Sequence, residues 1–130
     1  MRYILDTDWI INFLAGKSDA AAKLERLDPK EIVISLVTVG EIYESAYHFA
    51  NPAAHITKFR EFIDHFELLN LNLPIIERFA EIRAHLRRRG QMISDFDILV
   101  GATALHHNLT VLTYNRKHFA RIPDLKIYPA

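Results

Sequence analysis

YILDTD, residues 3–8, is a short apolar run followed at once by an acidic residue. Further apolar runs lie at 32–34 (IVI) and 110–113 (TVLT), with a shorter one at 125–127 (LKI). The first three runs are hydrophobic almost continuously rather than at alternate positions, which is typical of strands covered on both faces in a parallel sheet. The run at 68–71 (LLNL) is a candidate fifth strand nearer an edge. The chain therefore carries four or five short strands.

Segments with helical spacing lie between these strands. Apolar residues recur at intervals of three and four over 39–49, 56–66 and 75–86, and Gly90 is a stop signal for the third helix. A last helix, from Ser94 to about His106, is apolar nearly all round and is expected to be buried. Strands alternating with helices predict one α/β domain over residues 1–130, with three layers and a mostly parallel central sheet flanked by helices.

Composition excludes several classes of protein. The chain of 130 residues has no cysteine, which rules out disulfides, thiolate catalysis and sulfur-ligated zinc and fits a reducing cytoplasm, where we expect the protein. No apolar run approaches the roughly 18 residues that span a bilayer, and the N-terminus lacks a signal-peptide core, so we expect no membrane association. With 16 basic and 16 acidic residues, the chain has no overall basic excess for binding nucleic acid.

Acidic or amide side chains lie at four places where a predicted strand ends or a predicted helix begins. Asp6 follows the first strand, Glu41 is expected in the first turn of the next helix, Asp97 begins the buried helix and Asn115 follows the fourth strand. Ligands of open α/β sheets bind at the carboxyl ends of the strands, so these side chains are expected at one sheet edge. Clustered carboxylates repel one another unless a cation neutralises them, and oxygen ligands suit Mg²⁺ or Mn²⁺. The sequence thus predicts a metal site.

Each acid also has an alternative interpretation as a helix cap. The spacings Thr38–Glu41 and Ser94–Asp97 fit capping boxes, and Asp6 fits an N-cap of a short helix that follows it. Caps, however, need not be acids at one sheet edge, and a carboxylate that begins a nearly all-apolar helix is costly without compensation. The joint placement favours the metal site.

Basic and aromatic side chains suggest binding surfaces. Arg87, Arg88, Arg89 and Arg116 are candidates for contacts with phosphate groups, although a basic helix end also complements the helix dipole. The histidines show no metal-ligand spacing and are expected at the surface or at helix caps. Apolar and aromatic residues over 39–66 exceed what the core needs, which suggests an interface with a second copy or another protein. Its candidate residues are Trp9, Tyr43, Tyr47 and Phe49, although packing within the domain is the alternative.

Four stretches together resemble the PIN-domain family, and within it the VapC toxins of toxin–antitoxin pairs. They are ILDTD (4–8), TVGEI (38–42), ISDFDILVGATAL (93–105) and VLTYNRKHFARIPDLKI (111–127). Each motif alone is weak, but the ordered set covers essentially the whole chain. The resemblance implies a PIN-like fold and a magnesium-dependent RNA endonuclease, often dimeric, held inactive by a small antitoxin encoded beside it.

The resemblance also assigns residues. Asp6, Glu41 and Asp97 match the three invariant acids, while Asn115 matches a fourth polar position and Thr113 the hydroxyl residue before it; Thr7 and Asp95 are expected to support the site. Asp8 stands where asparagine is commoner and Ser94 where glycine is usual. The amide at the fourth position puts a two-metal arrangement in doubt. A metal-activated water would leave 5′-phosphate and 3′-hydroxyl ends.

Two other functions stay open at this point. Asp6 with Ser35 superficially resembles haloacid-dehalogenase-type phosphatases, in which the first aspartate is a nucleophile; Asp95 and Asp97 would supply the late acidic pair, but no well-placed lysine precedes them. The second alternative is a non-catalytic α/β binding module with capped helices and no metal.

Overall fold

The computed structural model describes residues 2–129, except for the side chain of Ser18, and it contains a five-stranded parallel sheet. The strands are β1 (Tyr3–Leu5), β2 (Ile32–Ser35), β3 (Glu67–Leu69), β4 (Thr110–Leu112) and β5 (Lys126–Ile127). Their order is β3-β2-β1-β4-β5, and every pairing among them is parallel. The predicted parallel sheet is confirmed, and the 68–71 run supplies the edge strand β3. β1 lies at the centre, so residues that follow it are surrounded by neighbouring strand ends.

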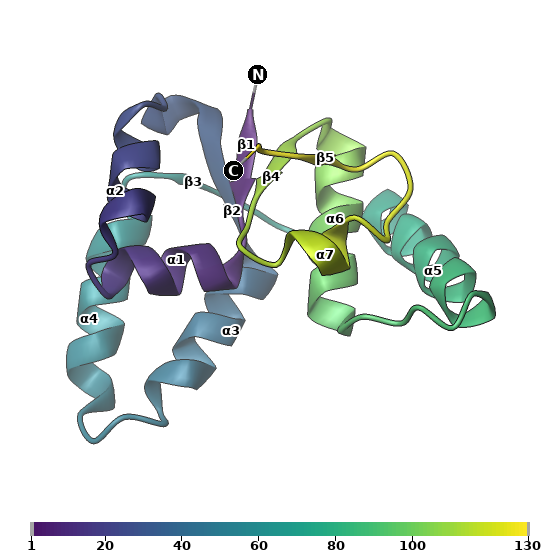
Figure 1. The fold of residues 1–130 in the computed structure, drawn as a ribbon. Helices are drawn as coiled ribbons and strands as arrows, with labels where there is room; N and C mark the ends of the chain where they lie inside the picture. Colours follow the sequence, from purple (N-terminus) through teal and green to yellow (C-terminus); the bar gives the residue numbers. More distant parts are fainter. Residues whose placement is uncertain (1, 130) are drawn as a thin grey trace.

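Helices cover both faces of this sheet (Figure 1). They are α1 (Thr7–Leu14), α2 (Ser18–Glu25), α3 (Leu36–Ala46), α4 (Pro52–Ile63), α5 (Leu73–Arg88), α6 (Asp95–His107) and α7 (Arg116–Phe119), with a 3-10 turn at Pro29–Glu31. The helices expected over 39–49 and 56–66 begin earlier, at Leu36 and Pro52, because Ser35 and Asn51 accept hydrogen bonds from free N–H groups at their first turns. No helix in the described part of the chain has both the length and the apolar character to cross a membrane.

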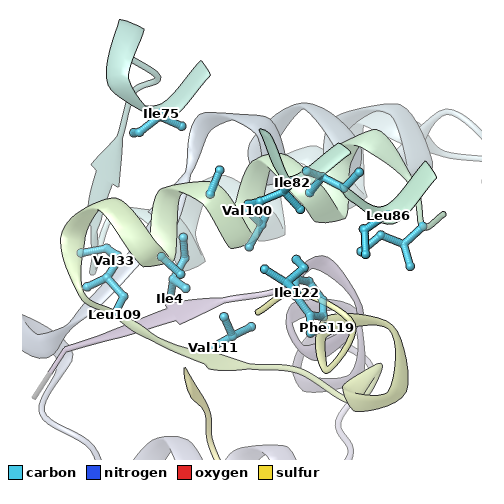
Figure 2. Packing of buried hydrophobic residues seen from close by; sticks show 14 residues of the cluster. Ile4, Val33, Ile75, Ile82, Leu86, Val100, Leu109, Val111, Phe119 and Ile122 are labelled. Carbon is cyan, nitrogen blue, oxygen red and sulfur yellow. The ribbon is translucent and has the colours of Figure 1, made fainter. Parts of the chain in front are cut away.

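Two hydrophobic clusters lie on opposite faces of the sheet. Alternate strand residues point to opposite faces, so Ile4, Val33 and Val111 join the cluster under α5 and α6, which Figure 2 shows. Leu5 and Leu112 join the cluster formed with α1, α3 and α4. The expected burial of α6 is confirmed, because its residues at 98, 100, 102 and 104 are fully buried. These layers fix the positions of the strand ends.

The aromatic residues expected at an interface differ in exposure. Trp9 is 1% exposed and its ring stacks against Phe13, so its expected role at an interface is wrong: it is part of the core. Tyr43 is partly buried and packs edge-on against Phe59. Tyr47 and Phe49 are 69% and 53% exposed. Of these four residues, Tyr47 and Phe49 alone expose more than half of their surface.

Candidate active site

Asp6 lies between β1 and α1 and is almost completely buried. Its N–H donates to the Leu112 carbonyl of β4 at 2.9 Å, which continues the sheet pairing to the end of the strand. Its Oδ2 atom accepts a hydrogen bond from Thr113 Oγ1 at 2.7 Å, whereas its Oδ1 atom is buried and has no partner. The side chain makes no capping bond to α1, so the cap alternative for Asp6 is wrong. A buried carboxylate oxygen without a partner is costly, and a ligand would relieve that cost.

The surroundings of Asp6 favour its neutral form when no cation is present. Burial is the main cause that raises its pKa to about 8, and the negative charges of Asp8 and Asp97 raise it further. The hydrogen bond from Thr113 acts in the opposite direction. A cation bound beside Asp6 would lower the pKa of Asp6 and so oppose the effect of the negative charges on Asp8 and Asp97.

The ends of β1 and β4 are joined by a small network around Asp8, in the first turn of α1. Asp8 Oδ1 accepts from the Tyr114 N–H at 3.3 Å and lies 3.3 Å from Thr113 Oγ1. The N–H of Asn115 donates to Thr113 Oγ1 at 2.9 Å, which fixes the hydroxyl that serves Asp6. We did not predict a role for Asp8 in the site. Its position two residues after Asp6, in a helix's first turn, was the available signal.

Glu41 reaches the site from the second turn of α3 rather than from the expected first turn. Ser35 Oγ accepts from the Val37 N–H at 3.1 Å and so begins the helix earlier. The capping-box alternative for Glu41 is therefore wrong. Its Oε1 atom instead accepts a hydrogen bond from Thr7 Oγ1 at 2.7 Å. Burial raises the pKa of Glu41, as do the charges of Asp97 and Asp8, while the bond from Thr7 opposes the rise.

Asp97 lies in the first turn of α6, as predicted. The cap itself is Ser94, whose Oγ accepts from the Asp97 N–H at 3.1 Å. The Asp97 side chain is 15% exposed, and its Oδ2 lies 4.0 Å from His118 Nδ1. Burial raises the pKa of Asp97; a hydrogen bond with the Ser94 side chain and the charge of His118 oppose the rise, and the charge of Asp8 adds to it. Three predicted acids thus lie within electrostatic range of one another or of Asp8.

Asn115 touches the acids only through an intermediate residue. It precedes α7 without capping it, and its Nδ2 lies 2.8 Å from His118 Nδ1. His118 in turn lies beside Asp97. We did not predict His118, because its spacing from the acids in the sequence shows no ligand pattern. In the structure, His118 links Asn115 to Asp97.

The remaining predicted residues divide into two groups. Asp95 is exposed and its Oδ1 accepts from Arg83 Nε at 2.8 Å, so it forms a surface ion pair and does not join the buried acids. The exposed arginines at 87–89 lie at the C-terminal end of α5, at the outer edge of the molecule and away from the end of β1 (Figure 1). Arg116 begins α7, directly after Asn115, and donates to the Tyr128 carbonyl. Of the four arginines, Arg116 alone directly follows a predicted site residue in the chain.

The donor set fits a hard divalent cation. Carboxylate oxygens are the ligands that Mg²⁺ and Mn²⁺ prefer, and Asp6 Oδ1 is buried without a partner. Within residues 2–129, no three acidic or histidine side chains already surround one point closely enough to hold a metal ion. Binding would therefore draw the carboxylates inwards, against their mutual repulsion, which the charge of the cation would offset.

Comparison with known proteins places the chain in a family. The PIN-domain family matches residues 3–125. Ribonuclease VapC1 of Methanocaldococcus jannaschii is 30% identical over 130 residues, which cover 98% of this chain and 87% of that protein. The tRNA(fMet)-specific endonuclease VapC of Salmonella typhimurium is 26% identical over 98% of this chain and 96% of its own length.

Solved structures agree with this match. The DNA-bound VapBC structure from Salmonella typhimurium contains a chain with a TM-score of 0.91 and 26% identity, covering 98% of this chain and 97% of that one. The VapBC-1 structure from nontypeable Haemophilus influenzae gives a TM-score of 0.87 and 27% identity, with 98% and 97% covered. The order of motifs, the parallel sheet and these matches lead to one conclusion. The chain belongs to the PIN-domain family.

Proposed function

We propose that this protein is an endoribonuclease toxin that hydrolyses RNA with a Mg²⁺ or Mn²⁺ ion held by Asp6, Glu41 and Asp97. The buried, unpartnered Oδ1 atom of Asp6 carries the proposal, because it lies among acids whose charges penalise ionisation. Such an arrangement is unfavourable alone and becomes favourable around a cation. The similarity to proteins named as VapC ribonucleases supports the same activity.

Each acid would have a defined part in this reaction. Asp6 and Asp97 would bind the ion directly, and Glu41 would be the third ligand or act through a water. A metal ion held there would supply the chemistry of activating a water and of stabilising negative charge on the phosphoryl oxygens. The hydroxyl groups of Thr113 and Thr7 hold Asp6 and Glu41 in place, as supporting residues of metal sites commonly do.

The two other functions have less support. In the phosphatase alternative Ser35 belongs to the site, but Ser35 Oγ is used to cap α3. The family match does not favour that class. A binding module without metal gives no reason for a buried, unpartnered carboxylate at the centre of the sheet. A chain without cysteine fits the cytoplasm, where we expect the nuclease to act.

We further propose that a small antitoxin covers the apolar pocket between α1, α3 and α4. The pocket has a volume of about 540 Å³, and Ile11, Tyr43 and Phe49 contribute to its lining. Related chains of known structure are described as parts of VapBC complexes. An exposed apolar pocket of this kind suits the apolar face of an amphipathic partner segment.

We also propose that the chain forms a homodimer. The exposed aromatic rings of Tyr47 and Phe49 are available to a second copy as well as to an antitoxin. Light scattering coupled to size-exclusion chromatography measures this directly. A monomer at every concentration tested would contradict the dimer and leave the nuclease proposal intact.

Matched amide substitutions test the proposed metal ligands. Glu41→Gln and Asp97→Asn each remove a charge that the cation requires, so RNA cleavage with Mn²⁺ should fall by orders of magnitude. Glu44→Gln and Asp95→Asn are the controls, since both acids lie on the same helices, are exposed and pair with His48 and Arg83. The controls should cleave like the wild type. Full Mn²⁺-dependent cleavage by both ligand variants would refute the site and favour the other functions.

A further inference from the structure

A second pocket adjoins the acids on the side of β4. Its volume is about 330 Å³, within the range of sites that hold small ligands. Its lining includes side chains from α1, α2 and the segments after β4 and β5, namely Trp9, Asp19, Lys23, Tyr114, Arg116 and Tyr128. Residues from four separate elements therefore form one concave surface.

Hydrogen bonds tie this pocket to the acids. Thr113 lines the pocket and donates to Asp6 Oδ2 at 2.7 Å. The backbone N–H of the next residue, Tyr114, donates to Asp8 at 3.3 Å. The pocket thus begins at the residues that hold the acids, and a group bound there would be a near neighbour of a phosphate at the metal site.

The aromatic walls of the pocket are held in fixed positions. The Tyr114 hydroxyl donates to Asp19 Oδ2 at 2.6 Å, and burial together with this carboxylate raises the pKa of Tyr114 to about 12, so the hydroxyl stays protonated. The ring of Tyr128 packs edge-on against Tyr3, with 5.7 Å between centroids. Tyr114 itself is 39% exposed. Fixed, partly exposed aromatic rings are surfaces on which single-stranded bases stack.

Polar groups beside these rings suit the rest of a nucleotide. Lys23 Nζ lies 5.7 Å from the centroid of the Tyr114 ring, and Arg116 is exposed at the start of α7. Both are cations that could contact backbone phosphates. Trp9, also in the lining, has an indole N–H that is buried without a hydrogen-bond partner. The lining thus combines stacking surfaces, cations and an unused donor.

We propose that this pocket binds the base of a nucleotide that flanks the scissile phosphate, with Tyr114 as the stacking residue. The inference rests on the proposed nuclease function and extends it to the way single-stranded RNA is held. Tyr114 is a substrate-binding residue in this scheme. It takes no part in the chemical step.

The test pairs a protein variant with an altered RNA. A single-stranded RNA that the wild type cuts at one site with Mn²⁺ is first selected from a randomised pool. Abasic residues are then placed singly at the positions on either side of the cut. At one flanking position the abasic residue should raise the KM of the wild type roughly five- to hundredfold, the range expected from loss of one base–aromatic stack.

The variant Tyr114→Ala should raise the KM for the intact RNA by a similar factor and should show no further loss with the abasic RNA. That non-additivity identifies a direct contact between the ring and the base. Tyr114→Phe keeps the stacking ring but loses the hydrogen bond to Asp19, so it should keep the abasic penalty, with a KM for the intact RNA between those of the wild type and Tyr114→Ala. Leu73→Ala, an exposed apolar change on α5 outside both pockets, is the control and should change neither value.

Two results would overturn the inference, and they differ in what else they refute. If the abasic penalty is the same in the wild type and in Tyr114→Ala, the base does not bind this pocket, while the nuclease proposal stands. If the wild type cuts no RNA with Mn²⁺, both proposals fail.

Discussion

Replacing Asp6 with asparagine should change how the stability of the metal-free protein depends on pH. The pKa of Asp6 is about 8 in the folded protein, against 3.8 for an unperturbed aspartate. The folded state therefore holds the proton more tightly than the unfolded state does. The free energy of unfolding is highest below pH 3.8, the pKa of the carboxyl in the unfolded chain. It falls as the pH rises from there towards the folded-state pKa of about 8, and it levels off above that pH.

The size of this effect follows from the two pKa values. Each pH unit within the interval lowers the free energy of unfolding by about 1.4 kcal/mol, so the change between pH 5 and pH 8 is about 4 kcal/mol. The variant Asp6→Asn cannot ionise, so it does not suffer this loss of stability as the pH rises. Its amide can still accept the Thr113 hydrogen bond, but it buries an NH₂ group where Oδ1 has no partner, at a cost of about 1–3 kcal/mol at every pH.

Urea unfolding in EDTA at pH 5, 6, 7 and 8 measures both quantities. Relative to the wild type, Asp6→Asn should gain about 4 kcal/mol between pH 5 and pH 8 and should be the more stable protein at pH 8. Asp64→Asn, an exposed change at the C-terminal end of α4, is the control and should follow the wild type. A constant difference between Asp6→Asn and the wild type across this range would show that the burial argument is wrong.

Three further substitutions test other parts of the account. Gly101→Val should lower the free energy of unfolding by about 1–3 kcal/mol in urea, because a Cβ at Gly101 would lie 2.5 Å from Ile122 Cδ1 in a packed core; an unchanged midpoint would contradict this. Ser94→Ala should cost about 1 kcal/mol by removing the cap of α6, whereas Ser94→Asn should keep it; equal stabilities of the two would contradict the capping role. Thr113→Val should weaken the apparent Mn²⁺ affinity in cleavage assays about 10- to 100-fold, since it frees Asp6 Oδ2; an unchanged affinity would remove Thr113 from the site.

The sheet could be predicted from sequence because its inner strands are buried on both faces. The runs at 3–5, 32–35 and 110–112 contain hardly any polar residue that would break the pattern. α2 was missed because Ala20 is the single fully buried residue among its described side chains, so it shows no apolar face. The start of α3 was misplaced because the apolar pattern begins at Val39, whereas the Ser35 cap begins the helix at Leu36.

The site was predictable where chain position alone determines it. Asp6 follows a central strand and Asp97 lies in the first turn of a buried helix, and both positions hold in the structure. Partners were not predictable, because local spacing gives no sign that Thr7 binds Glu41 across 34 residues. The arginines at 87–89 illustrate the same limit. Their charge is evident in the sequence, but which end of the domain they occupy depends on how α5 packs.

The end groups of cleaved RNA test the central claim most directly. A 5′-labelled RNA is incubated with the purified protein in Mg²⁺, in Mn²⁺ and in excess EDTA, and the fragments are analysed by mass spectrometry. Hydrolysis by a metal-activated water predicts cleavage only with the divalent ions, with 5′-phosphate and 3′-hydroxyl ends. Cleavage that survives excess EDTA, or fragments that end in a 2′,3′-cyclic phosphate, would contradict the claim that these acids work through a bound metal ion.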